Sequence, residues 1–148
     1  MAITVNSKKK QVKKTFQELI NDLMTSSSEK VRYNAARVLG EMGDSKAVEP
    51  LIDVLKNDKN GSVRLYAARA LGELGDSKAT EHLIESLRED RNVDVRVRAA
   101  RALGRLGGKI VVEPLVEALN DENSQVCITA TDAPVSYTHL RAHETDSY

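Results

Sequence analysis

Apolar residues recur along most of this chain at intervals of three and four positions, the spacing of an α-helix with one buried side. In the segment 31–43 the stripe consists of Val31, Ala35, Val38, Leu39 and Met42. In the segment 46–57 it consists of Val48, Leu51, Ile52, Val54 and Leu55. Two such stripes in sequence predict two amphipathic helices that pack together as an antiparallel hairpin.

Glycine and short polar residues mark the turns of this predicted hairpin. Gly43 follows the first helix, where a left-handed residue ends a helix at least cost, and Asp44 with Ser45 provides side-chain oxygens to cap the second helix. In a later copy Gly108 and Lys109 replace the Asp-Ser pair, so we predict that this turn is the least well capped.

The hairpin is repeated at an interval of 32 residues, with Val31, Val63 and Val95 opening successive first helices. A fixed period of this length is typical of stacked repeats, so the predicted fold is an all-α solenoid of antiparallel helix pairs. The segment 16–24 aligns with a second helix and is predicted to cap the stack. The repeat array thus occupies 11–133, as a cap helix, three helix pairs and one incomplete repeat, after a flexible basic extension at 1–10.

The repeated motif VRxxAAxxLGxxGDxxAVxxL resembles the HEAT-like repeat first described in phycobilisome lyases and found also in archaeal repeat proteins and deoxyhypusine hydroxylase. The resemblance covers about residues 16–133 and implies a helical solenoid. It implies no single function, because the family includes chromophore lyases, an iron enzyme and interaction scaffolds.

The repeat stops within its last copy. A further first helix is predicted from about residue 124, but Pro134 stands where Leu71 stands in an earlier copy. The following segment 135–145, VSYTHLRAHET, resembles a translated transposase-type sequencing adapter. We therefore expect a truncated natural protein with a non-native, disordered tail at 134–148. The cut helix should leave an uncapped edge prone to self-association, with these residues partly uncovered: Val112, Leu115, Val116 and Leu119.

Composition narrows the choice of partners. The 22 basic residues balance 22 acidic ones, so no overall field attracts nucleic acid or anionic lipid. The single cysteine, Cys127, cannot form an internal disulfide and fits a reducing cytosol, and neither a signal peptide nor a membrane span is recognisable. We predict a cytoplasmic protein that needs no metal and no cofactor.

The resemblance to deoxyhypusine hydroxylase allows one test for iron chemistry, because that family implies a His-Glu pair two residues after the motif valine. The three copies hold Tyr33-Asn34, Leu65-Tyr66 and Val97-Arg98 at this place. We therefore expect no catalytic residues and a chain that is not an enzyme.

Arginines recur at the repeat spacing in two ladders. For Arg32, Arg64 and Arg96 we predict hydrogen bonds to loop carbonyls or to Asp44 and Asp76 in adjoining turns. In the second ladder, Arg37 and Arg69 precede Glu41 and Glu73 by four residues, which predicts intrahelical ion pairs. The third copy has Arg105 opposite Arg101, with Arg98 nearby, which predicts a local basic patch.

Carboxylates align on the second helices in two rows, four residues apart, flanked by a few cations. Since second helices are expected to line the concave side of such solenoids, we predict an acidic groove for a protein partner, in particular a basic segment. The candidate partner-binding residues are Glu49, Asp53, Lys56, Glu81, Glu85, Arg88, Glu113 and Glu117.

Two other functions stay open at this point. The resemblance implies that the chain could be a subunit of a lyase or a hydroxylase-like enzyme. Alternatively, five lysines near the N-terminus would bind nucleic acid or an anionic surface weakly, namely Lys8, Lys9, Lys10, Lys13 and Lys14.

Overall fold

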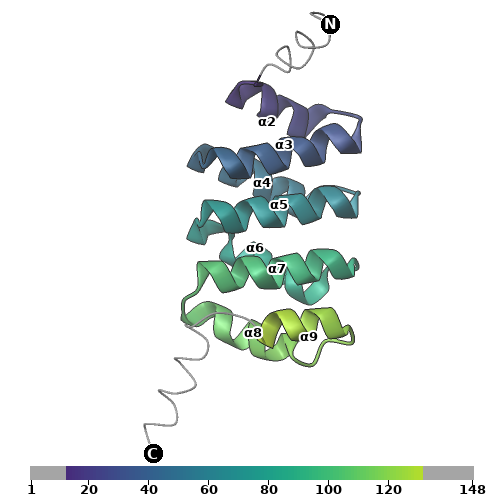
Figure 1. Cartoon of the computed structure of the whole chain (residues 1–148), viewed down its shortest axis with the longest axis vertical. Helices are drawn as coiled ribbons and strands as arrows, with labels where there is room; N and C mark the ends of the chain where they lie inside the picture. Colours follow the sequence, from purple (N-terminus) through teal and green to yellow (C-terminus); the bar gives the residue numbers. More distant parts are fainter. Residues whose placement is uncertain (1–12, 132–148) are drawn as a thin grey trace, which may run out of the picture.

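A computed structural model describes residues 13–131, and within this range every regular element is helical (Figure 1). The elements are α2 (Phe16–Thr25), α3 (Glu29–Met42), α4 (Val48–Asn57), α5 (Gly61–Leu74), α6 (Thr80–Glu89), α7 (Val93–Leu106), α8 (Val112–Ala118) and α9 (Ser124–Thr131). One-turn 3-10 helices precede three of them: η1 (Ser45–Ala47), η2 (Ser77–Ala79) and η3 (Lys109–Val111). The predicted all-α solenoid is confirmed.

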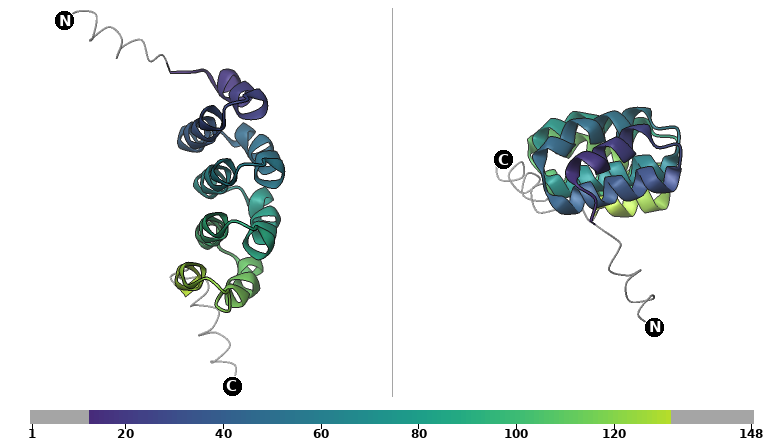
Figure 2. Two further views of the ribbon diagram at one scale, coloured as in Figure 1. Left: turned by 90° about the vertical axis from the view of Figure 1, so that its right-hand side faces the viewer. Right: turned by 90° about the horizontal axis from the view of Figure 1, so that it is seen from above.

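The helices form two parallel layers that curve together. Helices α3, α5, α7 and α9 stack in one layer, and α2, α4, α6 and α8 stack in the other (Figures 1 and 2). The left view of Figure 2 shows that the stack bows toward the layer of α2, α4, α6 and α8. We call this the outer layer, and the layer of α3, α5, α7 and α9 the inner layer.

Small residues explain the direction of the curve. A Cβ atom added to Gly40 of α3 would lie 2.8 Å from the Cα of Ala70 in α5, and one added to Gly72 would lie 2.9 Å from the Cβ of Ala102 in α7. Glycine and alanine therefore let neighbouring helices of the inner layer approach closely, while larger side chains fill the outer layer. The expectation that the second helices line the concave side is wrong, because the closest packing occurs between the first helices.

Side-chain caps begin the helices of the inner layer. The side chain of Asn60 accepts hydrogen bonds from the amides of Ser62 and Val63 at 2.9 and 3.2 Å, and Asn92 does the same for α7. Gly43 and Gly75 end α3 and α5 with φ values of 71° and 68°, as predicted.

Asp44 accepts a hydrogen bond from the amide of Lys46 at 2.9 Å, so it caps the 3-10 turn that leads into α4, and Ser45 lies inside that turn. In the third copy Gly108 provides no side-chain cap, and α8 has 7 residues where α4 and α6 have 10 each. The predicted weak cap is confirmed.

Leucines of both layers fill the core between the helices. Leu55 and Leu87 of the outer layer are buried, as are Leu39 and Leu71 of the inner layer. Met42 was expected in this core, but its side chain is 46% exposed because it lies in the last turn of α3.

At the other end of the array, Leu115 is fully buried, contrary to the expectation that it is partly uncovered, because α9 packs against α8. Val116 is 41% exposed, and Val112 and Leu119 are partly buried, as expected. The segments 1–10, predicted to be a flexible basic extension, and 134–148, predicted to be a non-native tail, lie outside the described residues, so both stay predictions.

Candidate partner-binding surface

All eight candidate residues are exposed, and they lie on consecutive helices of the outer layer. Helix α4 carries Glu49, Asp53 and Lys56. The equivalent residues are Glu81, Glu85 and Arg88 on α6, and Glu113 and Glu117 on α8. The rows are therefore in register, but on the convex side of the array and not in a concave groove (Figure 2).

One ion pair joins two of these residues across the outer layer. Arg88 donates from Nε and Nη2 to the carboxylate of Glu117 at 2.9 and 3.0 Å, and the hydrogen bond raises the pKa of Arg88. This pair ties α6 to α8 and removes Glu117 from the set of available carboxylates. Within residues 13–131 no ion pair is formed by Glu49, Asp53, Glu81, Glu85 or Glu113.

A shallow groove of about 570 Å³ runs between the C-terminal parts of α4 and α6. It contains two candidate residues, Lys56 and Glu85, together with Lys59, Glu89 and Arg91. Charges of both signs therefore line the groove, which suits a charged polypeptide segment better than an apolar ligand.

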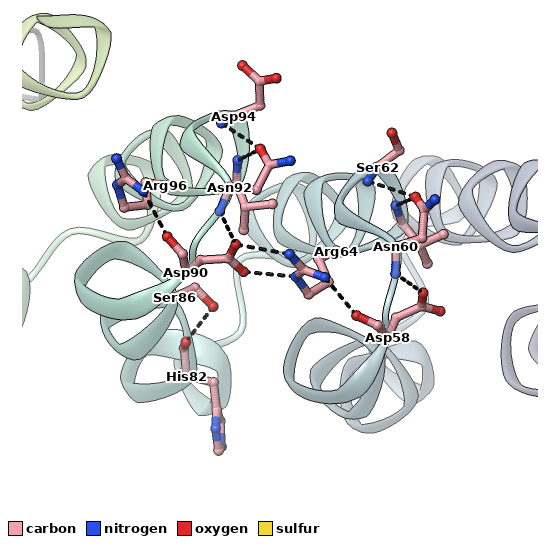
Figure 3. Close-up of polar contacts among 12 residues, drawn as sticks. Asp58, Asn60, Ser62, Arg64, His82, Ser86, Asp90, Asn92, Asp94 and Arg96 are labelled. Atoms are coloured by element: carbon pink, nitrogen blue, oxygen red, sulfur yellow. Dashed lines mark hydrogen bonds and ion pairs between the residues drawn. The ribbon is translucent and has the colours of Figure 1, made fainter. Parts of the chain in front are cut away.

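The first arginine ladder is structural. Figure 3 shows Arg64 donating from Nη1 to the carbonyl of Asp58 at 2.8 Å, and from Nε and Nη2 to the carboxylate of Asp90 at 2.9 and 3.1 Å. Arg32 and Arg96 make the same set of bonds one repeat earlier and later. We call each set an arginine clamp. The side chains of the Arg64–Asp90 pair are each only 8% exposed, and their charges neutralise each other within the clamp.

The predicted hydrogen bonds from these arginines to loop carbonyls are confirmed. The predicted bonds to Asp44 and Asp76 are wrong. The paired residues are Asp58, Asp90 and Asp121 of the loops between repeats, because Asp44 and Asp76 are used as caps. The sequence feature that indicates these pairs is an aspartate 26 residues after Arg32 and after Arg64, which the prediction did not use. In the last copy Cys127 takes the arginine's place, and its thiol donates to the carbonyl of Asp121 at 3.1 Å.

The second arginine ladder lies on the inner layer. Arg37 bonds to Glu41 at 2.8 Å and Arg69 to Glu73 at 2.9 Å, as predicted. Nearby, the positions tested for iron ligands hold a stacked pair, Tyr33 and Tyr66, whose ring centroids are 5.2 Å apart. Residues 13–131 contain no group of three or more His, Cys, Asp or Glu side chains arranged to hold a metal ion.

Two further findings concern the alternative that the N-terminal lysines bind nucleic acid or an anionic surface. Of the five N-terminal lysines, the structure describes Lys13 and Lys14; both are exposed, and Lys14 forms an ion pair with Asp22. None of the described helices is both long enough and apolar enough to cross a membrane.

Solved structures share this fold. The complex of CpcE and CpcF of phycocyanin lyase from Nostoc sp. matches with 26% identity and a TM-score of 0.69, over 90% of this chain and 64% of the other chain. Human deoxyhypusine hydroxylase in complex with glycerol matches with 24% identity and a TM-score of 0.72, over 86% of this chain and 44% of the other. The chain thus spans less than two thirds of either neighbour. No curated protein matches the chain.

These neighbours correct one prediction. The chain was expected not to be an enzyme, but the structures that it resembles belong to a lyase and a hydroxylase. The error has a chemical reason: the lack of His-Glu pairs in the three copies tests for a single iron chemistry and excludes no other.

The repeat family follows from the sequence match together with the fold. The family model for HEAT repeats matches residues 16–93 and again 80–137. These matches cover most of the chain, and the two curved layers of helices are the architecture that the repeat requires. The chain belongs to the family of HEAT-repeat proteins.

Proposed function

We propose that this HEAT-repeat chain is an interaction scaffold that binds a basic segment of a partner protein along its outer layer. One observation carries the proposal: Glu49, Asp53, Glu81, Glu85 and Glu113 are exposed in register on three neighbouring helices and form no ion pair within residues 13–131. Two cations interrupt the rows, and one of them, Arg88, is already bonded to Glu117.

Charge complementarity gives the expected partner and the expected behaviour. Lysines or arginines spaced along an extended segment would meet carboxylates from successive repeats. Since all these carboxylates are exposed, binding is expected to be weak, fast and strongly reduced by salt. Helices α4, α6 and α8, which carry the rows, contain no Phe, Tyr or Trp, which is consistent with a charge-steered contact and not with a tight apolar one.

Charge reversal tests this function. The probe is a fluorescent lysine-rich peptide, with its binding measured by anisotropy at low salt. The double variant Glu81→Lys/Glu85→Lys should bind about tenfold more weakly. The matched control is Asp94→Lys/Glu122→Lys, which makes the same charge change at exposed residues outside the rows and should bind as the parent does. Equal binding by the parent and the first variant would disprove the proposal.

A second candidate function is that of a subunit in a lyase-type enzyme. The favouring observation is the match over 90% of the chain to the CpcE and CpcF complex of phycocyanin lyase. The test is to mix the purified chain with a phycocyanin apoprotein and a bilin, and to follow covalent attachment by fluorescence after denaturing electrophoresis. Attachment above the level without the chain would support this function, and none with or without a second lyase subunit would reject it.

A further inference from the structure

The inner layer changes its charge in the third repeat. In α3 and α5, each arginine of the second ladder is neutralised by a glutamate four residues later, Arg37 by Glu41 and Arg69 by Glu73. In α7 the glutamate is replaced by Arg105, so the same face presents Arg101 and Arg105 without a carboxylate between them. The concave side is therefore near neutral over two repeats and basic over the third.

The arginines of α7 line a groove on the inner layer. A groove of about 500 Å³ is lined by Arg69, Arg98, Arg101 and Arg105, which we call the inner arginine cluster. Gly72 and Gly104 lie in its wall, and α9 contributes Gln125, Ile128 and Thr129 on the other side. Guanidinium groups of α5 and α7 thus border the groove on one side and α9 borders it on the other, and its volume leaves room for part of a ligand.

The cluster has positive charge that the rest of the described chain does not balance. Within residues 13–131, Arg98, Arg101 and Arg105 form no ion pair, and the one carboxylate at hand, that of Glu73, is bonded to Arg69. Arg98 is partly buried, and this burial, followed by the proximity of Arg101 and Arg69, lowers the pKa of its guanidinium group. Cations held together at this cost are stabilised by a bound anion.

We propose that the inner arginine cluster binds an acidic segment of a partner protein on the concave side of the array. Two or three carboxylates would pair with Arg98, Arg101 and Arg105, while the side chain of Ile128, 52% exposed, contacts an apolar residue of the same segment.

A peptide fits this site better than a nucleic acid does. Within residues 13–131, the two preceding helices of the inner layer, α3 and α5, carry paired charges at the equivalent positions, so a row of phosphates would meet no continuing row of cations there. The site also differs from the proposed outer surface in layer and in the sign of its charge, so it does not depend on that function.

The test exploits the difference between the repeats. Arg105→Glu restores in α7 the Arg-Glu pair that α3 and α5 contain, so it removes the positive charge while preserving the helix. The probe is a fluorescent peptide of alternating glutamate and leucine or glycine, measured by anisotropy with the whole chain at low salt. We expect Arg105→Glu to weaken binding about tenfold, and Arg98→Gln/Arg101→Gln to do the same.

Two controls make the result decisive. The variant Lys46→Gln/Lys109→Gln removes two exposed positive charges from the turns before α4 and α8 and should bind the peptide as the parent does. Circular dichroism should show the helix content of the parent in all variants and no loss of melting temperature. Equal peptide binding by the parent and Arg105→Glu would overturn the proposal. So would an equal loss in the lysine control, or tighter binding of a single-stranded oligonucleotide of matched charge that depends on the same arginines.

Discussion

At the scale of single residues, each arginine clamp connects neighbouring repeats, although arginine and aspartate are usually found on protein surfaces. Arg64 holds the loop carbonyl of Asp58 behind it and the carboxylate of Asp90 ahead of it, so one side chain joins two consecutive inter-repeat loops. The carboxylate of Asp90 also accepts a hydrogen bond from the backbone amide of Asn92 at 2.8 Å, which stabilises the turn into α7. Each clamp therefore sets the distance between neighbouring repeats.

Removing one partner of a clamp should be costly. Asp90→Ala leaves the guanidinium group of Arg64 buried without its carboxylate, so the free energy of unfolding should fall by about 3 kcal/mol. The measurement is urea unfolding followed by circular dichroism. The matched control is Asp94→Ala, an exposed aspartate in the first turn of α7, for which a change of at most about 0.5 kcal/mol is expected. If the two variants are equally stable, the clamp adds nothing to the fold.

At the scale of helices, glycine decides how closely the inner layer packs. Gly40 and Gly72 each follow a buried leucine in the sequence, and both are themselves buried against the next inner helix. Alanine would favour each helix by about 1 kcal/mol in isolation, since glycine is a poor helix former. In this array the contact between helices outweighs that gain, because a Cβ atom has no room.

Gly72→Ala should therefore destabilise the protein. The added Cβ would meet Ala102 at 2.9 Å from its Cβ and 3.0 Å from its Cα, so α5 and α7 must move apart. We expect a net loss of about 1–2 kcal/mol in the free energy of unfolding. Thermal melting compares it with Asn34→Ala on the exposed side of α3, which should be neutral or slightly stabilising. A rise in melting temperature for Gly72→Ala would contradict the packing described.

At the scale of the whole molecule, each helix pair packs only on its neighbours, so stability is expected to vary along the array. Helix α2 contacts α3 and α4, whereas α9 contacts α7 and α8 at the opposite end. The buried residues form one continuous core from Leu19 to Ala130, but the contacts that build it are mainly between neighbouring helices. A change at one end should consequently act locally before it unfolds the whole.

Hydrogen exchange can detect this directional behaviour. Leu19→Ala opens the packing of α2, where Leu19 is 4% exposed, so amide exchange should accelerate in α2 and α3 while α8 and α9 keep the rate of the parent. Leu115→Ala is the matched variant at the other end and should show the reverse pattern. Uniform acceleration along the chain in both variants would indicate a single cooperative unit instead.

Much of this architecture is determined by short-range signals in the sequence. The period of 32 residues, the apolar stripes and the glycine after each inner helix all act within one helix pair, so they are readable without coordinates. For the same reason the Arg37–Glu41 and Arg69–Glu73 pairs are predictable, since residues four apart share a helix face. The exposed rows of the candidate surface follow from the same periodicity.

The direction of curvature and the partners of the first arginine ladder depend on the tertiary structure. Curvature is the small difference between the spacing of the two layers, and that difference arises from contacts between helices 32 residues apart, such as Gly72 with Ala102. Likewise Arg64 meets Asp90 only because stacking brings two loops together. For this reason the sequence places the acidic rows on the wrong side of the array. The groove at the inner arginine cluster likewise depends on tertiary structure, because α9 forms one of its sides. Periodicity determines which residues share a face of a helix, whereas packing between repeats decides which face becomes concave.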